Sequence, residues 1–464
     1  MTTSADRNRS SSGDRIQSRL AEFALDLRYD DLGPDTVHAV KVRVIDTLGA
    51  LLGGFHGEPC EIARRISARV PVANGVSVIG TGMKTTPDMA AFVNGTTARY
   101  AELNDIYHVP GRPGGHPSDV LLPTLAAAEY RHANGIQFIT GVALAYEVYL
   151  RMTDTVEMPG FDYTNLVCLG TAVAAGKLFN LSVEQLSHCI SMAIIPNNAL
   201  LQGRKGHLSM WKVMATGQAG RAAVFAALLA QENAKGPSLP FEGKAGWCNH
   251  VAGKPFALDI LGGGRVPFRI HETLIKPRPA RYVTIPAVLA AEKVAPLDDP
   301  QRVKEVVVET FRRAAQGIDE HHWNPQSRET ADHSLPYVVA ATLLEGRITS
   351  DSFEDTRLHA PALVNLIKKI RIVENVEFTQ AHEKSSLHHT RVIVRREDDS
   401  RLIGESGGRH GDLSDRQNEA QVEEKFRSLA EKCLGRKRTR DVLKRLWNLE
   451  EMTDVAEIAS ALAI

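Results

Sequence analysis

The sequence LDILGGGRVP, residues 258–267, separates two different hydrophobic patterns. Before this glycine-rich stretch, apolar residues recur every three or four positions, which is typical of amphipathic helices. After it come short β-branched runs, which are typical of strands. We therefore predict a mainly-α fold with a large all-helical domain over residues 17–267 and a smaller α+β domain over residues 268–405.

The residues before the break predict a set of closely packed helices. Val37, Val40, Val44, Leu48 and Leu51 form one apolar helical stripe. The same periodicity continues over residues 122–130, 139–149, 166–179 and 211–231. Alanines and glycines in the last of these segments favour close contact between helices.

The residues after the break predict strands over 304–310, 370–378 and 391–397, with a helix over 334–345. Near the end of the chain, Val422, Phe426, Leu429 and Cys433 share one helix face. We expect the C-terminal helices, residues 406–464, to return to the helical domain.

The bulk composition excludes several classes of protein. Lys and Arg together number 55, as do Asp and Glu, so no overall positive field attracts nucleic acid. No run of about 18 apolar residues predicts a membrane span. The five cysteines form no CxxC pair, which argues against a disulfide framework or a cysteine zinc site and favours the cytoplasm. The polar residues 1–16 are expected to form a disordered tail.

The stretch ELNDIYHVPGRPGGHPSD, residues 102–119, carries the strongest chemical pattern. His116 lies on a glycine-rich turn before an apolar helix, a position that suits an acid–base group. We expect Ser118 or Asp119 to cap that helix. The alternative interpretation is a capped loop that contains an incidental histidine.

Two further stretches concentrate cations. GRKGHLSMWK, residues 203–212, ends with Lys212 at the start of an apolar helix, where a positive charge opposes the helix dipole. LIKPRPARY, residues 274–282, holds Lys276 and two arginines apart with prolines, an arrangement that suits carboxylate ligands. The alternatives are a solvated basic turn and a proline-rich linker. Whether Lys276 is a linker residue or a catalytic one, we expect it to have no buried partner.

A fourth stretch, WNPQSRETADHSLP at residues 323–336, combines Arg328, Asp332 and His333 ahead of a helix that Ser334 can cap. We interpret these three side chains as a buried structural network. The histidines of HEKSSLHH, residues 382–389, lack a partner motif, so we predict no metal site.

Taken in order along the chain, these landmarks resemble the MmgE/PrpD family. The similarity rests on LND followed by GHPSD, then SMWK, FEGKAGW, IKPRPARY and WNPQSRETADHSLPY. The resemblance implies a helical domain with a smaller α+β lid, a homodimer, and chemistry on di- and tricarboxylic acids without a cofactor. Family members include dehydratases, cis-aconitate decarboxylases and an iminodisuccinate epimerase.

The resemblance also implies roles for single residues. The residues that match the family's catalytic positions are His116, Lys212, Lys276 and Asp105. The residues expected to bind substrate are Glu102, Tyr107, Arg112, Arg204, His207, Arg278 and Tyr282. The chain departs from the family pattern where Glu102 and Ile106 replace an Asp and a Thr, where Arg278 replaces an aromatic residue, and where Val283 replaces a histidine.

We therefore expect a hydro-lyase that dehydrates 2-methylcitrate or a close relative. Proton abstraction next to a carboxylate is the step that the family's reactions share. A cis-aconitate-type decarboxylase and an iminodisuccinate-type epimerase are alternatives within the same chemistry. A non-catalytic helical binding protein is the alternative outside it.

Overall fold

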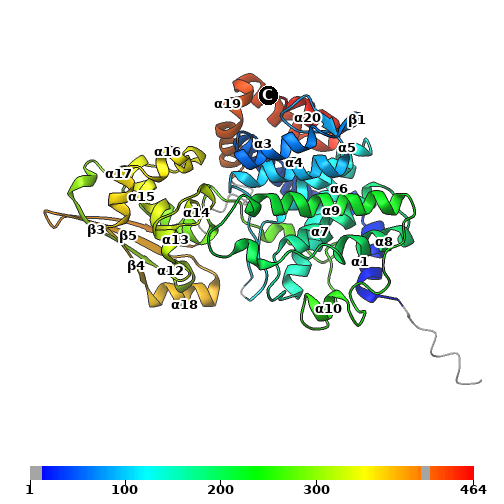
Figure 1. The fold of residues 1–464 in the computed structure, drawn as a ribbon, viewed down its shortest axis with the longest axis horizontal. Helices are drawn as coiled ribbons and strands as arrows, with labels where there is room; N and C mark the ends of the chain where they lie inside the picture. Colours follow the sequence, from blue (N-terminus) through cyan, green and yellow to red (C-terminus); the bar gives the residue numbers. More distant parts are fainter. Residues whose placement is uncertain (1–12, 110, 409–417) are drawn as a thin grey trace, which may run out of the picture.

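The computed structural model describes residues 13–109, 111–408 and 418–464, and these form two packed bodies (Figure 1). One hydrophobic cluster gathers residues between Ile16 and Ile275 together with residues beyond Val422. A second cluster gathers residues between Ala280 and Val394. The change of core falls after Ile275 rather than at residue 268, because Phe268 and Ile270 still pack in the first cluster.

The first body is built mainly from helices, as the periodicity predicts. Its central helices α4, α6, α7 and α9 pack on one another. At Gly217 of α9 an added Cβ would lie 2.4 Å from the carbonyl oxygen of Phe92, so only glycine allows this approach of α9 to α4. The helices are α1 (Arg15–Asp26), α2 (Gly33–Gly54), α3 (Glu58–Ser67), α4 (Pro87–Tyr100), α5 (Leu121–Tyr130), α6 (Gly135–Thr155), α7 (Thr164–Leu178), α8 (Val183–Ile194), α9 (Trp211–Gln231) and α10 (Trp247–His250).

Two details of the first body differ from the prediction. It is not all-helical, since β1 (Pro71–Ser77) and β2 (Lys84–Thr85) form a small antiparallel sheet between α3 and α4. The glycine-containing turn between them offers no helical periodicity, so the helix pattern could not reveal this hairpin. Most of the predicted tail, residues 1–12, lies outside the described residues, and α1 already begins at Arg15.

Among the described helices, α9 alone is long and apolar enough to cross a membrane by length and composition. It packs against α4, α7 and α8, which identifies it as a core helix of the first body. Its outward side carries Trp211 and Phe225, each 51% exposed.

The second body contains a four-stranded sheet in the order β4-β3-β5-β6. The central strand β3 (Val303–Thr310) is parallel to β4 (Ile370–Glu374) and antiparallel to β5 (Thr390–Arg396), which pairs with β6 (Arg401–Ser406). The helices around it are α11 (Ile285–Glu292), α12 (Arg312–Ala315), α13 (Glu320–Trp323), α14 (Arg328–Ala331), α15 (Leu335–Glu345), α16 (Asp355–Leu358), α17 (Pro361–Ile367) and α18 (Val376–Ser385).

Two sequence predictions for this body need correction. The strand predicted over 370–378 ends at Glu374, because the Asn375 side chain accepts hydrogen bonds from two backbone N–H groups and starts α18. Strand β6 was not predicted, since its exposed edge position leaves little hydrophobic signal. The helix predicted over 334–345 is confirmed, with the Ser334 hydroxyl capping it at the N–H of Tyr337.

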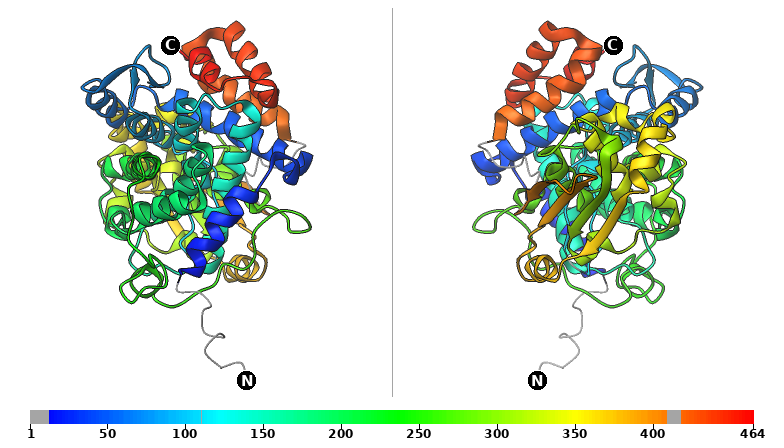
Figure 2. Two further views of the ribbon diagram at one scale, coloured as in Figure 1. Left: turned by 90° about the vertical axis from the view of Figure 1, so that its right-hand side faces the viewer. Right: turned by 90° about the vertical axis from the view of Figure 1, so that its left-hand side faces the viewer.

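The C-terminal helix α19 (Glu419–Trp447) lies against α2 in the first body, followed by α20 (Ala456–Ala461) (Figure 2). Val422 and Phe426 on its inner face belong to the first hydrophobic cluster. The chain therefore leaves the first body, builds the second, and returns.

Candidate active site

A cavity of about 180 Å³ lies where the two bodies meet. The loop after α4, which contains Glu102 and His116, forms one wall. Residues of the second body, among them Arg281, Arg313 and His333, form the other. The cavity therefore draws its side chains from five separate segments of the sequence.

Backbone pairing fixes the shape of the loop over residues 102–116. Ile106 pairs with Leu274 in an isolated β-bridge, and Tyr107 pairs with Gly115. An added Cβ at Gly115 would lie 2.4 Å from the Tyr163 ring, so this position requires glycine. The glycines of this stretch therefore bring the backbone next to His116 close to the floor of the site.

His116 is held in one tautomer by two hydrogen bonds. Its Nδ1 donates to the Asp105 carbonyl oxygen at 2.8 Å, since a carbonyl can only accept. Its Nε2 accepts from Arg99 Nη2 at 2.8 Å, since a guanidinium can only donate. Burial lowers the pKa of the imidazole well below 6.5, and the charges of Arg99 and Lys276 lower it further. His116 is therefore neutral, with its lone pair on Nε2.

Asp105 shapes the turn that carries His116 and does not line the cavity. Its carboxylate accepts a hydrogen bond from the Ser118 N–H at 2.8 Å and another from the Tyr146 hydroxyl at 3.1 Å. Burial raises the pKa of this carboxyl above its ordinary value. The prediction that Ser118 or Asp119 caps the helix is wrong, because Val120 occupies the N-cap position of α5 with no side-chain hydrogen bond, and the Asp105 carboxylate accepts from the Ser118 N–H.

Glu102 joins three cations at the floor of the cavity. Its Oε1 lies 2.8 Å from Lys276 Nζ, and its Oε2 lies 2.6 Å from Arg99 Nη1 and 3.2 Å from Lys212 Nζ. Burial alone would raise the pKa of Glu102, but Arg99, Lys212 and Lys276 together hold it well below its ordinary value. Burial lowers the pKa of Lys276 to about 8.

The second body contributes Asp332 and His333 to the same network. Lys212 Nζ donates to Asp332 Oδ1 at 2.8 Å and lies 3.1 Å from His333 Nδ1. Burial lowers the pKa of His333 to about 4, helped by the charge of Lys212. The interpretation of Asp332 and His333 as a buried network therefore agrees with their contacts, and these contacts belong to the site.

The ligand atoms of Glu102, Asp332 and His333 lie within 4.8 Å of one another, a spacing that suits a metal ion. The Lys212 ammonium lies within 3.2 Å of all three. A protein cation thus already occupies the position that a metal would take between these groups.

The two bodies correspond to two known domains. The MmgE/PrpD N-terminal domain matches residues 18–259, and the MmgE/PrpD C-terminal domain matches residues 279–449. The chain belongs to the MmgE/PrpD family. The residues between the two matches include the glycine-rich break and Lys276.

Relatives of two activities resemble the chain over most of its length. The 2-methylcitrate dehydratase of Escherichia coli O157:H7 is 27% identical over 376 residues, which cover 74% of each chain. The mitochondrial 2-methylcitrate dehydratase of Yarrowia lipolytica is 26% identical over 80% of this chain and 74% of its own. The human cis-aconitate decarboxylase is 24% identical over 94% of this chain and 92% of its own.

The residues that match the family's catalytic positions lie at different depths. His116 lines the cavity, whereas Glu102 lies between the cavity and the ammonium groups of Lys212 and Lys276. The expectation that Lys276 has no buried partner is wrong, because Glu102 pairs with it. A substrate carboxylate can contact either lysine only after the Glu102 side chain turns aside.

Three of the predicted substrate-binding residues line the cavity in addition to Glu102: Tyr107, Arg112 and Tyr282. The Tyr107 hydroxyl donates to Asp154 Oδ1 at 2.5 Å, and Arg112 Nη1 donates to the Thr155 carbonyl at 3.1 Å. Both side chains are therefore anchored to the end of α6.

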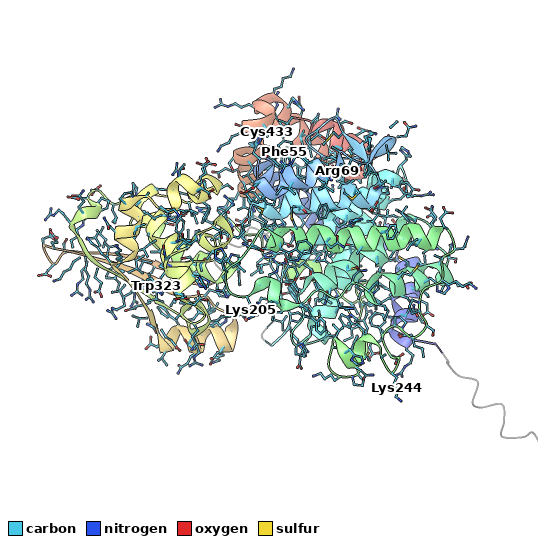
Figure 3. The ribbon with its side chains drawn as sticks, viewed as in Figure 1. Phe55, Arg69, Lys205, Lys244, Trp323 and Cys433 are labelled. Carbon is cyan, nitrogen blue, oxygen red and sulfur yellow. The ribbon has the colours of Figure 1, made fainter. Side chains whose placement is uncertain are left out.

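The remaining three predicted substrate-binding residues lie outside this cavity. Arg278 forms an ion pair with Glu292 and faces a separate groove. His207 is exposed and contacts the ring of His321 near the boundary of the two bodies, where Figure 3 labels the neighbouring Lys205 and Trp323. Both residues lie close in sequence to a lysine of the site, but neither side chain lines this cavity.

Arg204 does not line the cavity and acts on the site through the start of α9. Its Nε pairs with Asp162 Oδ2 at 2.8 Å, and its Nη1 donates to the Lys212 carbonyl at 2.6 Å. It therefore holds the first turn of α9, which positions the Lys212 side chain.

The sequence did not identify Arg99 or Arg313 as site residues, and it marked Arg281 only as one of the cations of the IKPRPARY stretch. Arg99 lies in the last turn of α4, and its Nη1 is 2.6 Å from Oε2 of Glu102, which follows the end of that helix. Arg281 stands in the IKPRPARY stretch, where only the lysine was matched to a family position. No local pattern marks Arg313.

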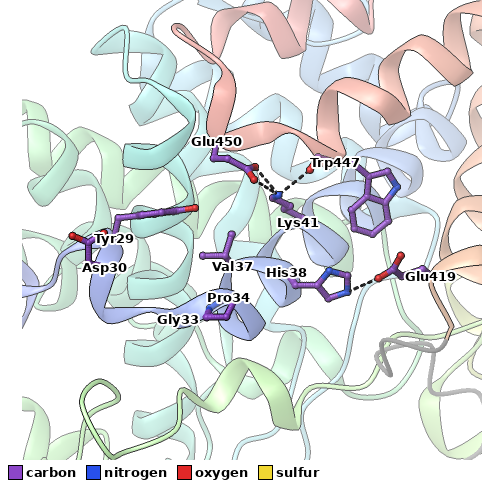
Figure 4. Close-up of a pocket in the computed structure, with 10 residues that line it drawn as sticks. All are labelled: Tyr29, Asp30, Gly33, Pro34, Val37, His38, Lys41, Glu419, Trp447 and Glu450. Carbon is purple, nitrogen blue, oxygen red and sulfur yellow. Dashed lines mark hydrogen bonds and ion pairs between the residues drawn. The ribbon is translucent and has the colours of Figure 1, made fainter.

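Larger grooves exist on the described surface, and in the one described next the charged side chains form ion pairs with one another. One of about 610 Å³ runs between α2 and α19, where His38 pairs with Glu419 and Lys41 with Glu450 (Figure 4). We place the chemistry in the smaller cavity because acid–base groups and cations of four segments converge there.

Proposed function

We propose that this protein is a lyase that removes water from a hydroxylated di- or tricarboxylic acid, with 2-methylcitrate or a close relative as substrate. The observation that carries the proposal is the neutral His116, whose lone pair on Nε2 lies beside the cations of a buried cavity. The 2-methylcitrate dehydratases among the relatives support the substrate class.

In this proposal His116 is the general base. A proton on the carbon next to a carboxylate is weakly acidic, and its removal places negative charge on the carboxylate oxygens. Arg99 donates to His116 Nε2 at 2.8 Å, so its guanidinium must shift onto the substrate carboxylate to free the lone pair, and there it meets that charge. Fixed donors of this kind contribute about 2.7–4 kcal/mol to transition-state stabilisation in other enzymes.

Lys276 is the proposed general acid. With a pKa of about 8 its ammonium is protonated at neutral pH and gives up its proton more readily than an ordinary lysine. Once the Glu102 side chain has turned aside, the carbon–hydroxyl bond breaks as Lys276 protonates the leaving oxygen, and the electron pair of the former C–H bond forms the alkene. The products are one unsaturated polycarboxylate and one water molecule.

We propose further that the second body acts as a lid and that the protein is a homodimer. The cavity between the bodies supports the lid, because movement of either body would open the cavity to solvent. Exposed Trp211 and Phe225 on α9 support a partner surface. Light scattering on the full chain measures the oligomeric state directly.

Mixing the protein with 2-methylcitrate and following ultraviolet absorbance tests the main proposal. A new carbon–carbon double bond conjugated to a carboxylate raises the absorbance, and NMR identifies the product. Absence of product from 2-methylcitrate and from a panel of related hydroxy acids would reject the dehydratase assignment.

A decarboxylase is the second candidate function. The human cis-aconitate decarboxylase aligns with nearly the whole chain, including both bodies. Release of carbon dioxide from cis-aconitate would favour this activity, and inversion of a dicarboxylate without loss of atoms would favour an epimerase. Binding of polycarboxylates without any turnover would favour a non-catalytic protein.

A further inference from the structure

Two arginines at the mouth of the cavity differ from the cations at its floor. Arg281 and Arg313 both line the cavity. At the floor, Arg99, Lys212 and Lys276 each have a carboxylate oxygen of Glu102 within 3.2 Å. Across the described ranges, no carboxylate oxygen lies within 4 Å of the Arg281 or Arg313 guanidinium.

The neighbours of these two arginines form no close ion pair with them, although the charge of Glu102 raises the pKa of Arg281. Arg313 Nη1 contacts the ring of His108, and burial with the charge of Arg313 lowers the pKa of that histidine to about 3. His108 is therefore uncharged at neutral pH. The side chain of Arg281 has no hydrogen-bond partner among the described residues.

The two positive charges also act on each other. Burial lowers the pKa of both guanidinium groups, and the charge of Arg281 lowers that of Arg313 further. Two like charges that are partly removed from water destabilise the empty site, and an anion bound between them would relieve that repulsion. Guanidinium groups bind carboxylates with two parallel hydrogen bonds.

We propose that Arg281 and Arg313 together bind a carboxylate of the substrate that takes no part in the reaction. The proposal rests on the assignment of a polycarboxylate substrate. The reacting carbon lies at the floor, next to His116, while the remote carboxylate lies at the mouth. Arg281 and Arg313 thereby select substrates that carry a second carboxylate at this distance from the reacting carbon.

This role makes a specific kinetic prediction. A carboxylate far from the reacting bonds contacts its arginines equally in the ground state and in the transition state. Loss of such a contact raises KM and leaves kcat nearly unchanged. A residue that supports the fold, or one that takes part in the chemistry, would change kcat instead.

The test compares Arg281→Met and Arg313→Met with the matched control Arg312→Met. Arg312 is the adjacent residue in α12, but its side chain points to Glu374 and Glu383 on the surface. We expect each cavity variant to raise KM at least about tenfold, since a hydrogen bond to a charged group contributes about 1.5–3 kcal/mol. The kcat of both variants and both parameters of Arg312→Met should stay near the wild-type values.

Binding of tricarballylate, a tricarboxylate without a hydroxyl group, separates this inference from the proposed function. If wild-type protein binds tricarballylate and the two arginine variants bind it at least tenfold more weakly, the inference holds even when no substrate is turned over. Equal binding by wild-type and variant proteins would overturn the inference while leaving the dehydratase intact. Absence of tricarballylate binding to wild-type protein would also overturn the inference, whereas turnover of 2-methylcitrate tests the dehydratase separately.

The variants Arg281→Lys and Arg313→Lys are controls for a folding defect in the methionine variants. They keep the charge but lose the paired hydrogen bonds, so their KM should lie between the wild-type and methionine values. A methionine variant with lower kcat and unchanged KM would overturn the inference, because the arginine would then act on the reaction itself.

Discussion

The floor and the mouth of the cavity use cations in opposite ways. At the floor, Glu102 and Asp332 pair with Arg99, Lys212 and Lys276, and all five side chains are buried. At the mouth, Arg281 and Arg313 face the cavity, and among the residues that the structure describes neither forms an ion pair with a carboxylate. Every cation of the floor has a carboxylate oxygen of Glu102 within 3.2 Å, whereas the two arginines of the mouth have none within 4 Å in the described part of the chain.

This difference separates two tasks of an active site. Groups that move protons must be held in one geometry and one protonation state, and a closed network of ion pairs provides both. Groups that capture an anionic substrate must keep their charge available until it arrives. The comparison predicts that changes at the floor act on turnover and changes at the mouth act on affinity.

The largest expected effect follows from the loss of the floor histidine. His116→Ala removes the imidazole whose two hydrogen bonds fix its lone pair on Nε2, so kcat should fall at least about a hundredfold. Steady-state kinetics on the purified variant, with circular dichroism to confirm folding, measure this. A folded variant with near wild-type kcat would remove His116 from the mechanism.

A second effect concerns the pH dependence of kcat/KM. If Lys276 is the acid, its ammonium is required, and raising the pH through its pKa of about 8 removes the proton. We expect kcat/KM to fall about tenfold per pH unit above that value. A pH profile between 6 and 10 measures this limb.

Lys276→Met provides the control for that profile. Its remaining activity should be low and should lack the alkaline limb. The variant should also unfold more easily, by at most about 3–5 kcal/mol, because it removes one partner of a buried ion pair. A limb that persists in Lys276→Met would assign the titration to another group.

A smaller effect concerns the free energy of unfolding, which should depend on pH through histidines of the floor and of the mouth. The pKa values of His116, of His333 at about 4 and of His108 at about 3 lie below the unfolded value of about 6.5. Below pH 6.5 the unfolded chain therefore binds more protons than the folded protein, and the free energy of unfolding falls. Each histidine should contribute a loss of about 2 kcal/mol between pH 6.5 and pH 5.

Urea denaturation at pH 7 and pH 5 measures this loss. His333→Asn and His108→Asn should each reduce the difference between the two pH values by about 2 kcal/mol. An unchanged difference in either variant would show that the replaced histidine does not cause the loss.

The smallest expected effect is that of chelation. The Lys212 ammonium already lies among Glu102, Asp332 and His333, so treatment with EDTA should leave kcat unchanged. Loss of activity on chelation, restored by a divalent metal or iron, would contradict the proposal that residues of the chain alone perform the chemistry.

Much of the fold was predictable because helix periodicity is a local signal. The predicted helix over 211–231 has the same bounds as α9, and the strand predicted over 304–310 differs from β3 by one residue. The hairpin of β1 and β2 and the start of α18 at Val376 were missed. In both places a single turn or capping side chain decides the structure against the surrounding hydrophobic pattern.

The candidate site was less predictable because its pairs join distant segments. Lys212 and Lys276 were found from the sequence, but their common partner Glu102 lies 110 and 174 positions away. The sequence shows which groups are charged, and only the fold shows which of them neutralise one another. Arg278 and Arg281, three residues apart, illustrate this: the first pairs with Glu292, and the second faces the cavity.

The β-bridge between Ile106 and Leu274 has a consequence for how the chain tolerates changes in length. Both backbone hydrogen bonds of the pair measure 2.8 Å, with Glu102 four residues before Ile106 and Lys276 two residues after Leu274. This pairing sets the separation of carboxylate and ammonium independently of the connection that leads to Leu274. Residues added at the turn of Gly263 and Gly264, where a side chain would meet no neighbouring atom, should lengthen the connection without shifting the ion pair.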